Sequence, residues 1–102
     1  MAYPYRFNEY SYNEYIEAFE WYEFKERGLG IRFMNSVEQK LIQISLHPEY
    51  YGKRNSKFRE TKIQDFPYMI VFEFLKSKNQ VHIVAVYHNK RNSRRRWKGR
   101  NL

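Results

Sequence analysis

The apolar positions near the start of the chain alternate with polar ones, and this pattern predicts a strand. Tyr3, Tyr5 and Phe7 are separated by Pro4 and Arg6. A period of two places the three aromatic side chains on one face of a sheet. The proline places the strand at the sheet edge, because proline has no N–H to donate to a second neighbouring strand. The chain is therefore expected to begin with a short edge strand.

The next segment has the spacing of an amphipathic helix. Ser11 followed three residues later by Glu14 resembles a capping box, and the helix is expected to run to about Arg27 and to end at Gly28. Its apolar residues recur at i, i+3, i+4 and i+7: Tyr15, Ala18, Phe19 and Tyr22. Its glutamates lie around the other side and are interpreted as a solvated face rather than a carboxylate site: Glu17, Glu20, Glu23 and Glu26.

A second helix is predicted between the tight turn Gly28-Leu29-Gly30 and His47, because Pro48 terminates it. Four apolar residues form one face of this helix: Phe33, Val37, Leu41 and Ile44. Three further apolar residues lie roughly opposite: Ile31, Ile42 and Leu46. A helix that is apolar on two sides is expected to lie between helix one and a sheet or a partner.

The second half of the chain predicts three strands. Segments 58–64, 68–75 and 81–87 are rich in β-branched and aromatic residues, and a tight turn at 65–67 and a loop at 76–80 separate them. The order β-α-α-β-β-β predicts a two-layer α+β fold, in which a helical hairpin packs on one face of a small antiparallel sheet. The 102 residues are expected to form one domain with a basic C-terminal segment at 89–102.

Charge is distributed unevenly along the chain. The formal net charge of +8 divides into −4 for residues 1–26 and +12 for residues 27–102, and no acid follows Glu73. Seven cations fall between Lys90 and Arg100, directly after the last predicted strand. A dense positive charge at the edge of a folded core favours a polyanionic partner, either nucleic acid or an acidic protein.

Several function classes are excluded or disfavoured. Without cysteine the chain has no disulfide, no thiolate catalysis and no cysteine-based zinc site. The longest apolar run, 68–72, is too short to cross a bilayer, and no signal peptide is recognisable, so a cytoplasmic protein without membrane contact is expected. His82 and His88 lie about 20 Å apart along one strand and cannot share a metal. Neither a metal nor another cofactor is expected.

What remains is a basic surface with interleaved aromatic residues. Arginine and lysine neutralise phosphates, while tyrosine, histidine and tryptophan stack on unpaired bases, so single-stranded nucleic acid is a candidate ligand. The alternative is that the C-terminal arginine run is a solvated tail without a specific ligand.

A set of short motifs follows one another along residues 15–97: Trp21-Tyr22-Glu23, Gly28-Leu29-Gly30 with Phe33, then Pro48, Arg59, Phe66-Pro67-Tyr68-Met69-Ile70-Val71-Phe72, Ala85-Val86-Tyr87-His88, Arg91 and Trp97. In this order and spacing they resemble the RelE/ParE superfamily of toxins from type II toxin-antitoxin modules. The resemblance implies a helical hairpin on a small antiparallel sheet, in agreement with the organisation predicted above.

The resemblance leaves two activities open, of which the first is enzymatic. RelE-like members are ribosome-dependent mRNA endonucleases, in which basic side chains on the sheet converge on one phosphate without a metal ion. Matched by position, the catalytic residues of such an enzyme would be Lys62, His88 and Arg91, and Trp97 would stand near the C-terminal tyrosine of the family.

Two departures from the RelE pattern favour the second activity. Glu60 stands where a second lysine is expected, and Met69 stands where a central arginine is expected. An acid repels the substrate phosphate, and a methionine cannot stabilise the charge that develops there. ParE-like members lack the catalytic set and poison DNA gyrase by protein contact, so a ParE-like toxin is favoured.

The expected interaction residues fall into two groups. Residues expected to contact the target or nucleic acid are Arg59, Arg91, Arg94, Arg95, Arg96 and Trp97. Residues expected to bind an acidic cognate antitoxin are Trp21, Phe24, Ile31, Ile42 and Leu46. A third hypothesis, outside the toxin class, is a plain nucleic-acid-binding module in which the arginine run contacts phosphates.

Overall fold

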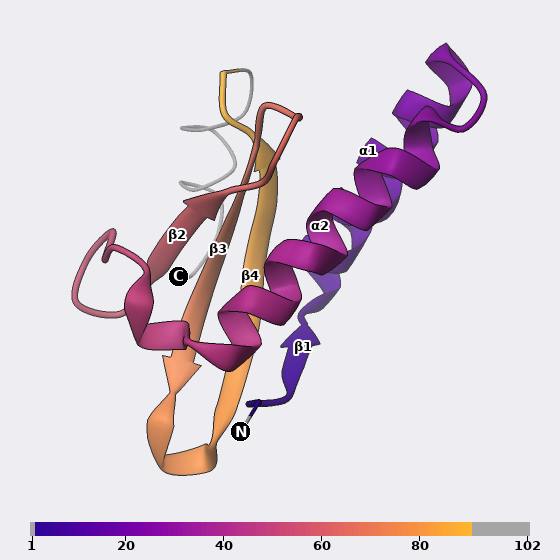
Figure 1. Cartoon of the computed structure of the whole chain (residues 1–102). Helices are drawn as coiled ribbons and strands as arrows, with labels where there is room; N and C mark the ends of the chain where they lie inside the picture. Colours follow the sequence, from indigo (N-terminus) through magenta and orange to yellow (C-terminus); the bar gives the residue numbers. More distant parts are fainter. Residues whose placement is uncertain (1, 91–102) are drawn as a thin grey trace.

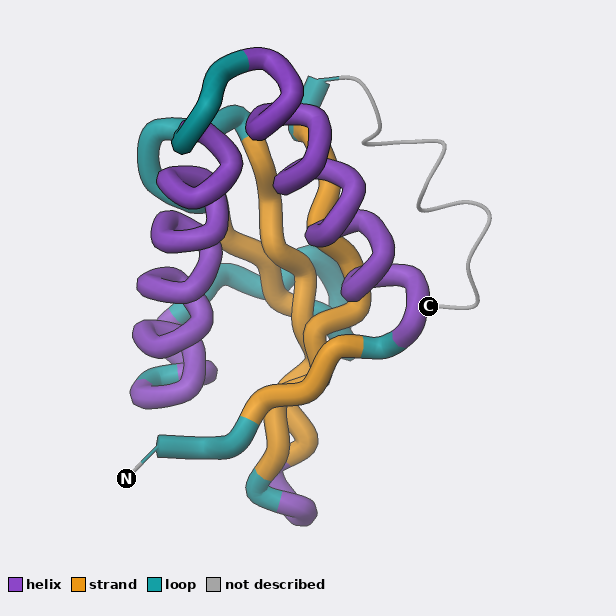
Figure 2. Tube along the Cα trace, turned by 90° about the vertical axis from the view of Figure 1, so that its right-hand side faces the viewer, coloured by secondary structure: helices purple, strands orange, loops and turns teal. Residues whose placement is uncertain are grey.

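The computed structural model of the chain describes residues 2–90, which form two layers. Four strands make one sheet in the order β1-β4-β3-β2, with bounds β1 Tyr5–Phe7, β2 Arg59–Lys62, β3 Tyr68–Leu75 and β4 Gln80–His88. Two helices, α1 Glu9–Lys25 and α2 Leu29–Leu46, form a hairpin that lies on one side of this sheet (Figures 1 and 2). The predicted order β-α-α-β-β-β is confirmed.

Two short 3-10 turns and one parallel strand pair complete the topology. The turn η1, Pro48–Tyr50, follows α2, and the turn η2, Lys76–Lys78, connects β3 to β4. The pairs β2–β3 and β3–β4 are antiparallel, whereas β1 lies at the edge beside β4 and runs parallel to it. The edge position of β1 agrees with the sequence prediction, and the sheet is mixed rather than purely antiparallel.

Helix α1 begins one turn earlier than the sequence pattern indicated. Asn8 is its N-cap: the Asn8 side-chain oxygen accepts a hydrogen bond from the Ser11 N–H at 2.8 Å, and the Ser11 hydroxyl accepts one from the Asn8 N–H at 3.1 Å. The prediction that Ser11 and Glu14 form the capping box was therefore wrong. Asparagine is as good an N-cap as serine, and here it directly follows β1.

Side chains of α1 form hydrogen bonds to the main chain of β4 where the pairing with β1 ends. The three residues of β1 pair with only the first part of β4. Where this pairing ends, the Ser11 hydroxyl donates to the Ile83 carbonyl at 2.7 Å, and further along β4 a carboxylate oxygen of Glu14 accepts from the Val86 N–H at 2.9 Å. Both side chains are buried. Glu14 satisfies the buried Val86 N–H, and Ser11 adds a second hydrogen bond to the Ile83 carbonyl, which also accepts from the Asn8 N–H at 3.2 Å.

The turn between the helices depends on Glu23 and two glycines. Gly28 has φ +87°, a conformation that side chains disfavour. The Glu23 carboxylate accepts from the N–H groups of both Gly28 and Gly30, each at 2.9 Å, at the start of α2. The interpretation of Glu23 as part of a purely solvated face was therefore wrong, because its carboxylate caps the next helix.

The core lies between the helices and the sheet and is largely aromatic. The predicted inner face of α2 is confirmed, since its four residues are at most 1% exposed: Phe33, Val37, Leu41 and Ile44. The Phe33 ring packs against Tyr22, Phe66 and Tyr68, with ring centroids 5.0 to 5.3 Å apart. The sheet face turned away from the helices, called the far face below, carries a second buried cluster: Phe58, Val71, Val84, Ala85 and Tyr87.

Candidate functional site

Strand register decides which candidate residues share the far face. Lys62, Met69 and Tyr87 lie in one row across β2, β3 and β4. Glu60 lies on the same face two residues before Lys62, since successive strand side chains alternate between faces. Ile70, which belongs to the core under the helices, marks the opposite face. The far face therefore carries Glu60 and Lys62 together, with Met69 between Lys62 and Tyr87.

The Glu60 side chain on this face is neutralised by an arginine. Arg54, in the loop before β2, places a guanidinium nitrogen 2.6 Å from a carboxylate oxygen of Glu60 and 3.3 Å from the Tyr87 hydroxyl. Partial burial lowers the pKa of Arg54, but the hydrogen bonds and charges of Glu60 and Tyr87 outweigh this effect and raise the pKa above its usual value. Arg54 is therefore a charged partner of Glu60.

Lys62 and His88 lie on opposite faces of the sheet. Lys62 is exposed on the far face. His88 is in register with Tyr68, and its imidazole contacts the Tyr68 ring on the helix-facing side at a centroid distance of 5.3 Å. His88 Nδ1 also accepts a hydrogen bond from the Lys90 N–H at 3.2 Å. This arrangement does not bring the two predicted catalytic side chains together on one face.

The remaining predicted target residues are Arg59, at the start of β2, and residues of the C-terminal segment. The Arg59 guanidinium donates to the main-chain carbonyls of Tyr51, at 2.7 Å, and Glu49, at 3.4 Å, so it holds the loop in place while keeping its charge. Five further residues lie outside the described residues, and their roles stay predictions: Arg91, Arg94, Arg95, Arg96 and Trp97.

The predicted partner-binding residues are exposed apolar side chains on the helical hairpin. Phe24 of α1 is 87% exposed and Ile42 of α2 is 55% exposed, and the other three are also open to solvent: Trp21, Ile31 and Leu46. The Lys25 amine lies 4.8 Å from the centre of the Trp21 ring, near the tip of the hairpin, which projects beyond the sheet (Figure 1). Sequence reasoning did not single out three further exposed aromatics: Tyr10, Tyr12 and Tyr50.

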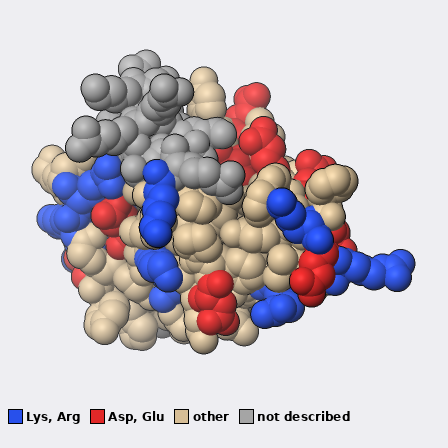
Figure 3. Space-filling view, turned by 90° about the horizontal axis from the view of Figure 1, so that it is seen from above, with Lys and Arg blue, Asp and Glu red and all other residues tan. Residues whose placement is uncertain are grey.

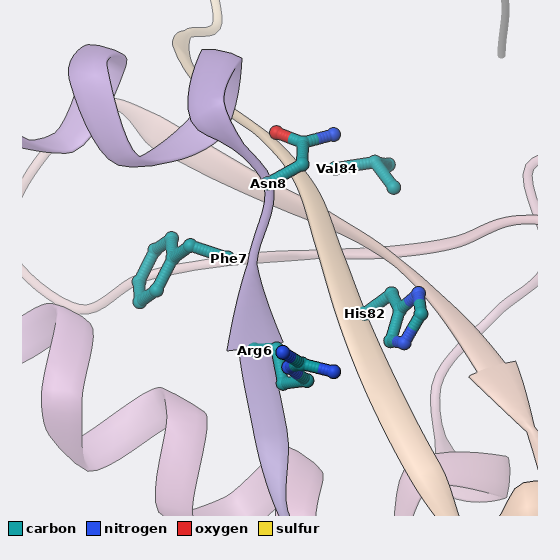
Figure 4. Close-up of a pocket in the computed structure, with 5 residues that line it drawn as sticks. All are labelled: Arg6, Phe7, Asn8, His82 and Val84. Carbon is teal, nitrogen blue, oxygen red and sulfur yellow. The ribbon is translucent and has the colours of Figure 1, made fainter.

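A small hollow lies at the other edge of the sheet, where β1 meets β4. It measures about 190 Å³ and is lined by Arg6, Phe7, Asn8, His82 and Val84. Arg6 and His82 are register neighbours, and Figure 4 shows their side chains on one side of the strands while the Phe7 ring points to the other.

His82, in the lining of this hollow, has polar neighbours on β3 and β4. The His82 Nε2 atom lies 3.1 Å from the Gln80 side-chain oxygen. Glu73 is the register neighbour of His82 on β3 and therefore lies on the same face. The five lining residues include Arg6 but neither Glu73 nor another acid.

The described residues offer neither a cluster of metal ligands nor a membrane-spanning helix. Within residues 2–90, no three potential metal-ligating side chains come together. Neither of the two helices in this range is long and apolar enough to span a membrane.

Solved structures of toxins share this fold. A chromosomal ParDE toxin-antitoxin system from P. aeruginosa is similar with a TM-score of 0.73 at 6% identity, covering 85% of this chain and 96% of that one. The isolated RelE toxin of E. coli is similar with a TM-score of 0.66 at 20% identity, and the match covers 96% of this chain and 94% of that one. A chain of the intact E. coli RelBE toxin-antitoxin complex has a TM-score of 0.66 at 22% identity, and the match covers 88% of this chain and 100% of that one.

The chain therefore has the RelE/ParE-like fold, as the sequence resemblance implied. No protein-family model matches the chain, and no curated protein matches it in sequence. The similar structures span both branches of the fold, and their identities of 6% to 22% establish architecture alone.

Proposed function

We propose that this chain is the toxin of a type II toxin-antitoxin pair and that it acts in the ParE manner, by binding DNA gyrase. The fold supports the toxin assignment, because ParDE and RelBE structures share it over most of the chain. The observation that favours ParE over RelE is the arrangement of charge on the sheet. Glu60 occupies the far face beside Lys62 and is bound to Arg54.

Cleavage in the RelE manner requires several cations around one phosphate, because negative charge grows there in the transition state. Here one arginine is occupied by Glu60, Met69 contributes no charge, and His88 lies on the other side of the sheet. Each missing donor costs a factor of about a hundred or more in rate. A protein-binding mode of action makes no such demand on the far face.

The antitoxin is proposed to cover the exposed apolar residues of the hairpin. RelE has been solved in complex with a peptide of its antitoxin, which provides a precedent within this fold. An amphipathic segment that orders on binding can bury apolar residues on two helices at once. Acidic residues on such a segment would complement the net charge of +12 that residues 27–102 carry.

Induced expression with two separate readouts tests the mode of action. We expect growth arrest with a DNA-damage response and gyrase-linked breaks, while primer extension finds translated messenger RNA uncut. Lys62→Ala and His88→Ala variants should arrest growth as strongly as the parent chain. Codon-positioned cuts that disappear in either variant would instead identify the ribosome-dependent endonuclease, which is the alternative function.

A further inference from the structure

We propose that a basic cleft beside the outer edge of the sheet binds the phosphate backbone of nucleic acid. The cleft has a volume of about 160 Å³ and is lined by Glu49, Lys53, Ser56, Lys57, Arg59, Phe74 and Lys76. Four of these seven side chains are cations and one is an acid. This binding surface goes beyond the proposed contact with a protein target.

The positive charge of the cleft is largely uncompensated. Glu49 is the acid in its lining, and it lies 3.9 Å from the Lys76 amine in a pair whose side chains are 59% and 74% exposed. An ion pair between such exposed side chains is weak, so it compensates little of the positive charge of the cleft. Arg59 is held by neutral carbonyl groups, which leave its charge in place. Lys53 and Lys57 form no ion pair with any of residues 2–90, and both are exposed.

The loop that carries two of these lysines is fixed by hydrogen bonds. The Arg54 N–H donates to the Phe58 carbonyl at 2.8 Å, and Lys53 pairs with Arg59 as an isolated β-bridge. The Asn55 side chain accepts from the N–H groups of Lys57 and Phe58, each at 2.8 Å. The chain therefore holds like charges together before any ligand arrives, and an anion entering the cleft relieves their repulsion.

The cleft lies apart from Lys62, an exposed cation of the far face. Phe74, in the cleft, and Met69, in the row of Lys62, are five residues apart on β3, which corresponds to about 17 Å. The cleft therefore lies toward η2, at the opposite end of β3 from the row of Lys62. Figure 3 shows lysine and arginine side chains on two sides of the molecule seen from above, one of them the side where Figure 1 places β2 and the loop before it.

Nucleic acid fits this cleft better than an acidic protein does. Lysines recognise a phosphate as point charges and make no demand on base sequence. Phe74 is the one large apolar side chain in the lining, so a protein partner would find little apolar surface to bury there. A repeating phosphate backbone supplies the charge that four neighbouring cations require.

Salt dependence of binding tests the proposal with two charge-matched variants of the full-length protein. The cleft variant carries Lys53→Ala, Lys57→Ala and Lys76→Ala. The control carries Lys25→Ala, Arg27→Ala and Arg32→Ala, which removes the same charge from the helical hairpin. Fluorescence anisotropy with labelled duplex DNA and single-stranded RNA is measured from 50 to 200 mM salt, and circular dichroism checks that both variants fold.

Each lysine that neutralises a phosphate of duplex DNA contributes about 0.9 to the slope of log affinity against log salt, and about 0.7 for single strands. Removal of three should flatten the slope on DNA by about 2.7, so that the parent loses about 40-fold more affinity than the cleft variant across this range. The control should keep the parent slope, and Glu49→Gln should bind more tightly. The nucleic acid with the larger slope change is the ligand.

Equal slopes for the cleft and control variants would overturn the proposal, because binding would then follow net charge alone. Polyglutamate that binds the cleft as tightly as either nucleic acid would also overturn it in favour of an acidic protein. Neither result bears on growth arrest, so the proposed toxin function stands or fails separately.

Discussion

Two glutamates of α1, one buried and one half-buried, accept hydrogen bonds from main-chain N–H groups of other elements. Glu14 accepts from Val86 across 72 residues of sequence, and Glu23 accepts from Gly28 and Gly30 at the start of α2. A hydrogen bond to a charged acceptor contributes about 1.5 to 3 kcal/mol, more than most exposed ion pairs. These side chains therefore serve the fold rather than the target site.

Replacing Glu14 tests this role. Glu14→Leu removes the acceptor and leaves the Val86 N–H buried without it, so we expect a loss of about 1 to 3 kcal/mol in the free energy of unfolding. Glu14→Gln keeps an oxygen that can accept, and should lose less than the leucine variant. Glu20→Leu, an exposed position on the same helix, serves as the control. Urea unfolding measures the free energy of unfolding of the three variants. Equal stability of Glu14→Leu and Glu14→Gln would contradict the hydrogen-bonding role of Glu14.

At the scale of elements, the close approach of α1 and α2 depends on one glycine. A Cβ atom added at Gly30 would lie 2.7 Å from the Phe19 carbonyl oxygen and 2.9 Å from Glu23 Cβ. The carbonyl is backbone and cannot rotate away, so the helices would have to separate. The same shift would disturb the hydrogen bond from the Gly30 N–H to Glu23.

Gly30→Ala should therefore destabilise the protein, although alanine is otherwise the better helix former. We expect a loss of about 1 to 3 kcal/mol from the overpacked contact, against a propensity gain of about 1 kcal/mol at an unhindered position. Gly52→Ala is the matched control, because nothing lies within 4 Å of its added Cβ atom. Thermal unfolding compares the two, and a melting temperature for Gly30→Ala at or above the parent value would refute the argument.

Periodicity predicted the elements well, and failed where distant groups meet. The inner face of α2 and the bounds of β3 followed from spacing alone, since burial imposes that spacing. The start of α1 did not, because Asn8, Ser11 and Glu14 all offer capping groups and β4 decides which of them is drawn into the core. Spacing also could not predict that Lys76 of η2 joins Lys53 in one cleft, because these two segments are far apart in sequence.

At the scale of the molecule, the excess positive charge is concentrated in one segment. Residues 91–102 contain six of the 19 lysines and arginines and no acid, so residues 2–90 carry a net charge of only +2. The sequence located this charge but could not assign Lys62 and His88 to faces, because register fixes that assignment. The apolar side chains on the hairpin, rather than charge, are therefore the stronger attraction that residues 2–90 offer to the proposed antitoxin.

Neighbouring positions on α2 test that conclusion. Ile42 is 55% exposed, and the adjacent Gln43 is also exposed. Ile42→Asp should weaken the complex with the antitoxin at least tenfold, because loss of one buried anchor in an interface costs about 1.4 kcal/mol or more. Gln43→Asp adds the same charge next to it and should change affinity far less.

Co-expression with the product of the adjacent reading frame, followed by size-exclusion chromatography and calorimetry, gives the two affinities, and melting temperatures confirm that both variants fold. Equal weakening by both substitutions would mean that charge governs docking on the hairpin. Unchanged affinity in both would place the antitoxin elsewhere on the molecule. A selective effect of Ile42→Asp is the outcome that we expect, since only that substitution removes apolar surface that the fold leaves open.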